Sequence, residues 1–175
     1  MRQWGFSLIE LMVVVAITAI LLAIGLPSFQ GALRSNLVTT TANELMSSFA
    51  LARAEALRSP GGAAICSTDD GTACGGDWND GWMVWVDMDG DGLPSGDDDR
   101  VLRYVEGNQK LVTDIDAPGG SAEAVTIRFD NRGRRIGQAR TLSVMPEECP
   151  GEQQLVRNLE LGATGQVKVI KGACS

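Results

Sequence analysis

The chain begins with a long apolar run. From Phe6 to Pro27 the only charged residue is Glu10. A helix rises about 1.5 Å per residue, so this run is long enough to cross the roughly 30 Å hydrocarbon core of a membrane. Arg2 in the short segment before it places the far end of the helix outside, by the positive-inside rule. Residues 6–27 are therefore predicted to be a transmembrane helix.

After Pro27 the apolar residues become periodic, with spacings of three and four that are typical of one face of a helix. The predicted apolar face consists of Phe29, Leu33, Leu37, Val38, Ala42, Leu45, Phe49, Ala52 and Ala56. The helix should end near Arg58, because Pro60 and two glycines follow. We expect residues 28–58 to form the amphipathic half of one long helix, with a possible kink at Pro27.

Beyond residue 59 the pattern changes to short β-like runs separated by Gly, Asp and Pro. The expected strands are 63–66, 82–87, 101–105, 110–115, 125–129, 140–144, 155–161 and 167–170. Regular spacing with turn signals favours antiparallel sheets that pack on the C-terminal half of the helix. The predicted fold class is α+β, with residues 59–175 as a β-rich globular head. Trp78, Trp82 and Trp85 are expected to pack in this head rather than to stack on a ligand.

Composition limits the functions that the chain can perform. The formal net charge of −7 disfavours a general nucleic-acid surface. There is no histidine, so Ser-His and Cys-His catalysis are excluded, and we expect a protein that is not an enzyme.

Four cysteines, at positions 66, 74, 149 and 174, have no CxxC spacing and no histidine to complete a zinc site. Paired disulfides in an oxidising compartment are the better interpretation. Proximity favours Cys66 with Cys74 and Cys149 with Cys174, while the two other connectivities remain open.

Glu10 is the unusual residue of the apolar run. A charge at the bilayer centre costs about 2.5 to 3.5 kcal/mol, so it needs a partner. No Lys or Arg follows until Arg34, far along the same helix. The partner of Glu10 is therefore expected to come from outside this helix.

Residues Gly5 to Glu10, with the sequence GFSLIE, resemble the type III signal of type IV pilins and of type II secretion pseudopilins. The resemblance implies the pilin fold and a leader peptide, 1–5, that prepilin peptidase removes between Gly5 and Phe6. It also implies N-methylation of Phe6 and pairing of Glu10 with the amino terminus of a neighbouring subunit. Pro27 matches the helix-weakening region of the family.

Two stretches of the head, Asp80 to Asp87 and Phe129 to Arg134, resemble the GspH/FimT/FimU group of minor pilins and pseudopilins. This resemblance implies a minor pilin in type IV pilus assembly or priming, or alternatively a type II secretion pseudopilin. The implied partners are other pilin or pseudopilin subunits, prepilin peptidase, the inner-membrane assembly platform and membrane lipid. The implied location is the bacterial inner membrane with a periplasmic head, and then the fibre.

An acidic segment after residue 86 is a candidate Ca²⁺ site. Asp87, Asp89 and Asp91 take positions 1, 3 and 5 of a calcium loop, and a glycine takes position 6. Position 12 is Asp98 rather than Glu, and a strand rather than a helix is expected to follow, so an EF-hand is disfavoured. A looser cage that includes Asp97 or Asp98 is one interpretation, and a solvated connection rich in turn formers is the other.

Five arginines lie between residues 128 and 140 of this acidic protein. FimT-type minor pilins are linked by resemblance to DNA binding through a basic Gly-Arg-x-Arg pattern near the C-terminus. Here the corresponding stretch, Gly165 to Lys168, has one cation. The candidate DNA contacts are Arg132, Arg134, Arg135 and Lys168. The alternative is a hairpin turn whose arginines are solvated and face the acidic segment or a neighbouring pilin.

Overall fold

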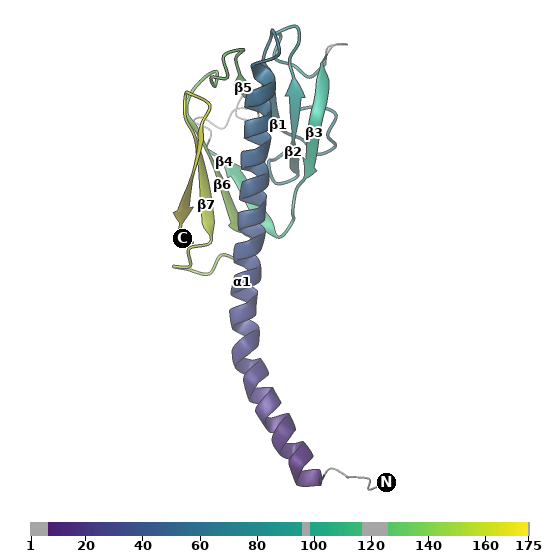
Figure 1. Ribbon diagram of the computed structural model, residues 1–175, viewed down its shortest axis with the longest axis vertical. Helices are drawn as coiled ribbons and strands as arrows, with labels where there is room; N and C mark the ends of the chain where they lie inside the picture. The colour runs from purple at the N-terminus through teal and green to yellow at the C-terminus, as the bar shows by residue number, and fades with distance from the viewer. Residues whose placement is uncertain (1–6, 96–98, 117–125, 175) are drawn as a thin grey trace. The chain divides into compact units, whose positions relative to one another are not determined.

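The computed structural model describes residues 7–95, 99–116 and 126–174, with the backbone alone at 26–28 (Figure 1). These residues form one helix and eight strands. In chain order they are α1 (Leu8–Ala56), β1 (Ala63–Ser67), β2 (Gly81–Val86), β3 (Arg100–Glu106), β4 (Leu111–Ile115), β5 (Thr126–Phe129), β6 (Arg140–Pro146), β7 (Val156–Leu161) and β8 (Val167–Gly172). The predicted α+β class is confirmed, and each expected strand is present with small shifts at its ends.

The chain divides into two compact units, Met1–Asn36 and Leu37–Ser175, and we call the second unit the head. The helical assignment of α1 continues through Pro27. Among the described residues, α1 is the one helix long and apolar enough to cross a membrane. The division at Asn36 lies beyond Pro27, where the sequence pattern had placed the change from membrane to amphipathic helix.

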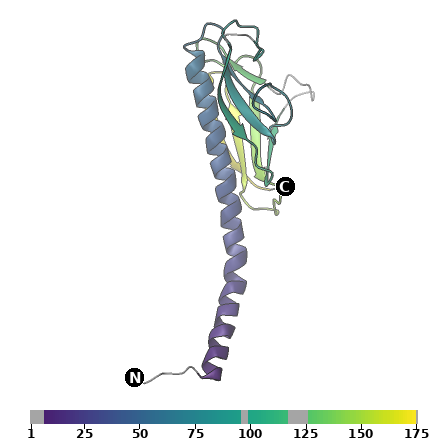
Figure 2. The same cartoon turned by 90° about the vertical axis from the view of Figure 1, so that its right-hand side faces the viewer.

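The head contains two antiparallel sheets of four strands, in the orders β3-β2-β1-β5 and β4-β6-β7-β8. In the first sheet β1 is central, so Ile65 lies opposite Val84 on one side and Ile127 on the other. A bulge between Val84 and Trp85 shifts the register of β2 against β3. Within the head, α1 runs along one side of the strands (Figure 2).

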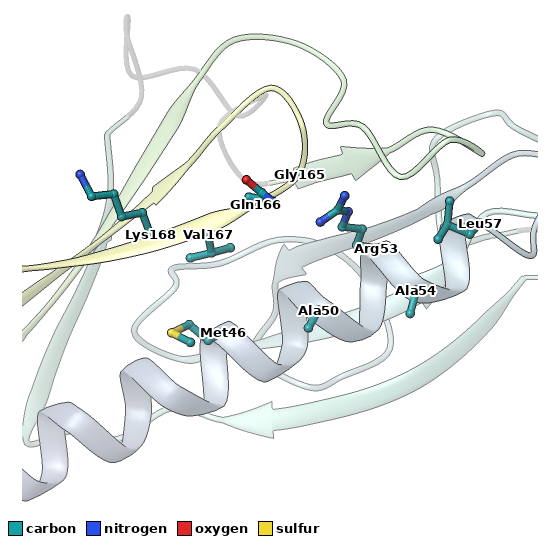
Figure 3. Close-up of a pocket in the computed structure, with 9 residues that line it drawn as sticks. All are labelled: Met46, Ala50, Arg53, Ala54, Leu57, Gly165, Gln166, Val167 and Lys168. Atoms are coloured by element: carbon teal, nitrogen blue, oxygen red, sulfur yellow. The ribbon is translucent and has the colours of Figure 1, made fainter.

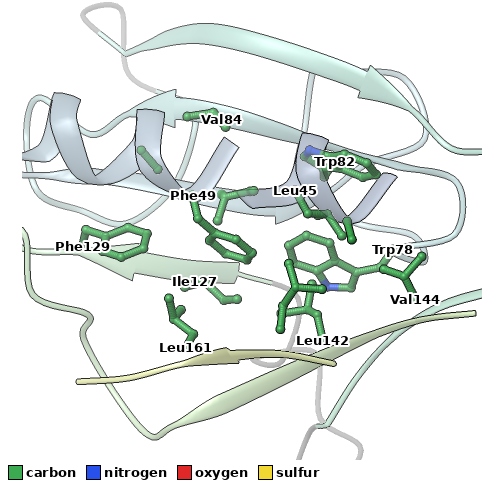
Figure 4. Packing of buried hydrophobic residues seen from close by; sticks show 14 of the residues in the cluster. Leu45, Phe49, Trp78, Trp82, Val84, Ile127, Phe129, Leu142, Val144 and Leu161 are labelled. Atoms are coloured by element: carbon green, nitrogen blue, oxygen red, sulfur yellow. The ribbon is translucent and has the colours of Figure 1, made fainter. Parts of the chain in front are cut away.

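The core of the head lies between α1 and both sheets. Leu45 and Phe49 of α1 pack with side chains from the two sheets, among them Trp82 and Leu142 (Figure 4). Trp82 Nε1 also donates a hydrogen bond of 2.9 Å to Ser48 Oγ. Three tryptophans, Trp78, Trp82 and Trp85, are all buried, which agrees with the packing role expected for them.

The apolar face predicted for α1 is buried from Val38 onwards but not before it. Its buried members are Val38, Ala42, Leu45, Phe49, Ala52 and Ala56. Phe29 and Leu33, by contrast, are 63% and 47% exposed. Both residues belong to the N-terminal unit, Met1–Asn36.

Two covalent links and one glycine shape the ends of the head. The structure contains disulfides between Cys66 and Cys74 and between Cys149 and Cys174, which is the connectivity favoured from sequence proximity. Gly62 lies just after the helix with a φ of 101°, and a Cβ at this position would collide with the carbonyl oxygen of Phe129. Glycine therefore permits the close turn from α1 into β1.

Candidate functional site

The first turn of α1 places Glu10 through a serine cap. The Glu10 N–H donates to Ser7 Oγ at 3.2 Å, and the Leu11 N–H donates to the Ser7 carbonyl oxygen at 3.2 Å. Ser7 and Glu10 have the Ser-x-x-Glu spacing of a capping box. Sequence reasoning missed Ser7 as a capping residue, although this spacing was visible in the sequence. The cap fixes the backbone on which Glu10 is presented.

The Glu10 side chain is exposed on the first turn of an apolar helix. The partial positive charge of the helix N-terminus favours a carboxylate here, by about 0.3–1 kcal/mol. This stabilisation is smaller than the free energy that burying a charge in lipid costs. Gly5 and Phe6, the predicted processing residues, lie outside the described part of the chain. Pro27 lies within α1, and it has no N–H to donate to a helical hydrogen bond.

The same N-terminal unit carries a shallow apolar hollow of about 310 Å³ on α1. Its lining consists of Leu11, Met12, Val15, Ala16 and Ala19. Small residues beside larger apolar ones allow close approach of a second helix in a membrane. This surface therefore allows a second helix to approach α1 closely.

In the acidic segment, Arg128 forms an ion pair with the buried carboxylate of Asp87. Asp87 is 1% exposed, and its Oδ2 lies 2.7 Å from Arg128 Nη2. The carboxylates of Asp87, Asp89 and Asp99 lie within 4.8 Å of one another. A cation in this cluster would have to share Asp87 with the guanidinium.

The cluster differs from the set of calcium ligands predicted from the sequence. Asp99 is in it, Asp91 is not, and Asp98 lies outside the described residues. Asp91 instead accepts the Leu93 N–H at 2.7 Å. The strand β3 follows the segment, so its continuation is not the helix of an EF-hand. Calcium binding here stays a prediction from the sequence.

The arginine-rich turn after β5 does not present all of its predicted cations to solvent. Asp130 Oδ2 accepts from Arg134 Nε at 3.0 Å and from Arg134 Nη2 at 2.9 Å. Burial alone would raise the pKa of Asp130, but hydrogen bonds from Arg134 and from the Arg132 N–H outweigh this effect and lower it. Arg134 is therefore paired with Asp130 although its side chain is 59% exposed, and Arg132 and Lys168 are exposed as well.

Arg135 is buried, so the expectation of a solvated arginine at this position was wrong. The backbone of Arg135 forms a β-bridge with Phe129 of β5, and its N–H donates to the Ala163 carbonyl oxygen at 3.1 Å. Its guanidinium donates to the Gln138 carbonyl oxygen. Burial lowers the pKa of Arg135, and the nearby charge of Arg140 adds to this effect. Two of the four predicted DNA contacts are thus turned inward or paired, and DNA binding stays a sequence prediction that a low-salt gel shift can test.

An apolar helix that bears one carboxylate near its start and continues into a head of antiparallel sheets defines the class of pilin-like subunits. The family model described as Type II transport protein GspH matches residues 41–165, and the prokaryotic N-terminal methylation motif matches residues 1–26. The chain belongs to the GspH family of pilins and pseudopilins. These are structural proteins, so the chain is not an enzyme.

Solved structures support the same fold. The chain is similar to the type IV minor pilin FimU of Pseudomonas aeruginosa in two crystal forms, each at 21% identity. One alignment covers 77% of this chain and 89% of FimU with a TM-score of 0.56. The other covers 75% and 91% with a TM-score of 0.52. A search of curated proteins found no match.

Proposed function

We propose that this chain is a minor pilin that takes part in the assembly or priming of a type IV pilus fibre. It is made with the leader 1–5, which prepilin peptidase removes before Phe6 is methylated. The protein is then held in the inner membrane, with its head in the periplasm, until the assembly platform moves it into the fibre. The observation that carries the proposal is a match to the methylation motif over residues 1–26, on the same helix that presents Glu10.

Glu10 acts in this proposal as the contact between subunits. Its carboxylate pairs with the amino group of Phe6 on a neighbouring chain, and the apolar hollow on α1 receives the helix of that neighbour. The ion pair contributes register more than affinity, since the desolvation of two charges offsets most of their attraction. Ser7 caps the turn that carries Glu10.

The alternative is a pseudopilin of type II secretion, which the name of the matched family favours. Both machines use the same signal, helix and head, so the fold does not separate them. Deletion of the gene distinguishes the two machines. Loss of surface pili with normal protein secretion supports the minor pilin, and loss of secretion with normal pili supports the pseudopilin.

Processing provides the first test of the proposal. In cells that make the prepilin peptidase, the intact mass of the protein should correspond to a chain that begins with methylated Phe6. Gly5→Ala should retain the five leader residues, because it adds a Cβ at the cut, where the family signal has glycine. Gln3→Ala, within the leader but away from the cut, is the matched control and should be processed. A parent chain that keeps its leader would contradict the proposal.

A further inference from the structure

The head carries an apolar groove between α1 and β8 that no part of the described chain fills (Figure 3). Its volume is about 780 Å³. The residues that form its apolar surface are Met46, Ala50 and Ala54 of α1, Leu57 just after α1, and Val167 of β8. The short side chains of Ala50 and Ala54 leave the space of the groove open. The side chain of Leu57 beside them is 58% exposed. Such an exposed apolar hollow in a head is typical of a contact surface for another protein.

The charges of this groove have one sign. Arg53 and Lys168 are among its lining residues, and no carboxylate is. Arg53 Nε donates to the Gly133 carbonyl oxygen at 3.0 Å, which fixes its position at the groove. Lys168 forms no ion pair with any described residue, although Glu160 lies opposite it in the register of β7 and β8. In a chain of net charge −7, this groove favours an acidic partner.

Residues 87–93 of the head, which we call the acidic loop, have features complementary to the groove: negative charge and an exposed apolar side chain. Leu93 is 59% exposed, and Asp89 and Asp91 precede it without ion pairs in the described part of the chain. An exposed leucine with carboxylates beside it has both features that the groove would select, an apolar side chain and negative charge.

The acidic loop is held in a fixed shape before any partner binds. The Asp87–Arg128 ion pair anchors its start, and Arg128 lies against Gly92, where a Cβ would meet the guanidinium. Three carboxylates, those of Asp87, Asp89 and Asp91, accept backbone N–H groups of Gly90, Asp91 and Leu93 at 2.7, 3.0 and 2.7 Å. A loop ordered in this way loses little conformational entropy on binding.

From this complementarity we infer that the groove binds the acidic loop of a second copy of this chain, with Leu93 in the hollow and Asp91 near Lys168. Groove and loop are different surfaces, so the contact is heterologous and each copy can offer one and accept the other. Such contacts generate a closed ring or an open chain of subunits, and a fibre requires the open chain. The inference rests on the proposed function, since it adds a contact between heads to the helix contact at Glu10.

Disulfide crosslinking between full-length chains tests the inference in cells that assemble the fibre. Two copies with different tags are co-expressed, one with Leu93→Cys and one with Ala50→Cys. The native cysteines are all in disulfides, so mild oxidation should yield a dimer that carries both tags. Val101→Cys on β3, an exposed position outside the acidic loop, replaces Leu93→Cys in the control and should give several-fold less dimer.

Charge reversal makes the test specific to the proposed contact. Lys168→Glu in the Ala50→Cys copy should lower the dimer yield several-fold, and Asp91→Lys in the Leu93→Cys copy should restore it. A yield equal to the control, a reversal without rescue, or an adduct in which Leu93→Cys joins another protein would overturn the inference. Blots of sheared fibres from the same cells separate this failure from that of the proposed function, because the parent chain would still be found in fibres.

Discussion

Two stretches of a single helix bury their apolar side chains to very different extents. From Leu8 to Ile24 every described side chain of α1 is exposed, with Leu8 at 73% and Ile24 at 70%. From Val38 onwards the same helix supplies the core of the head, and Leu45 is completely buried. The first stretch has no partner among the described residues, so lipid or other subunits must cover it, whereas the second finds its partners within the chain.

The strongest test of this comparison is a pair of large-to-small substitutions. Phe49→Ala should lower the free energy of unfolding of the head by about 3–5 kcal/mol, because it leaves a cavity in the core. Ile20→Ala, at a side chain that is 61% exposed, should change it by less than about 0.5 kcal/mol. Urea unfolding of the full chain in detergent, followed by tryptophan fluorescence, measures both. Equal effects would show that the two stretches are not energetically distinct.

A second pair compares two hydroxyl groups on α1 with the same local hydrogen bond. Ser48 Oγ donates to the Glu44 carbonyl oxygen at 2.9 Å, and Thr18 Oγ1 donates to that of Val14 at 2.7 Å. Only Ser48 also accepts from a buried indole, that of Trp82. Ser48→Ala should therefore cost about 1–3 kcal/mol in unfolding free energy.

Thr18→Ala is the control and should leave the unfolding of the head unchanged. If Ser48→Ala also leaves it unchanged, the bond to Trp82 does not contribute to the core.

Calcium should affect two neighbouring carboxylates of the head differently. A site formed by Asp87, Asp89 and Asp99 would stabilise the head by about 1.4 kcal/mol at ten times its Kd. The rise in Tm should vanish in Asp99→Asn and persist in Asp91→Asn, since Asp91 is outside the cluster. A Tm of the parent chain that calcium does not change would end the calcium prediction.

The smallest expected effect concerns acid stability. The pKa of Asp130 is lowered in the folded head, so its charged form stabilises the fold above pH 4, and this contribution disappears as the pH falls through the lowered pKa. Asp130→Asn should remove that dependence and cost less than about 1 kcal/mol at neutral pH. Arg132→Ala retains the backbone N–H and is the control. A difference in unfolding free energy between parent and Asp130→Asn that stays the same from neutral pH to low pH, or no difference at neutral pH, would contradict this assignment.

The sequence predicted the secondary structure well because the patterns are local. Spacings of three and four identified the buried face of α1, but Phe29 and Leu33 follow the same spacing and are exposed. The spacing of apolar residues indicates which face of a helix is apolar. It does not indicate at which residue of the helix the packing against the head begins.

The charged residues were harder to predict because their surroundings depend on segments far apart in the chain. Arg134 and Arg135 are adjacent, yet the bridge to Phe129 and the bond to Ala163 bury only the second. In the same way Asp99 joins Asp87 because β3 returns beside β2, which no spacing within the acidic segment could show.

We propose that the exposed stretch of α1 is a surface for assembly and that Glu10 is its specific contact. The most direct measurement compares the amounts of Glu10→Gln, Ser7→Ala and parent chain in membranes and in sheared surface fibres. Glu10→Gln keeps the capping geometry without the charge, whereas Ser7→Ala removes the cap and keeps the charge. We predict that all three insert in the membrane and that only Glu10→Gln is missing from fibres. Glu10→Gln in fibres at the level of the parent would contradict the account.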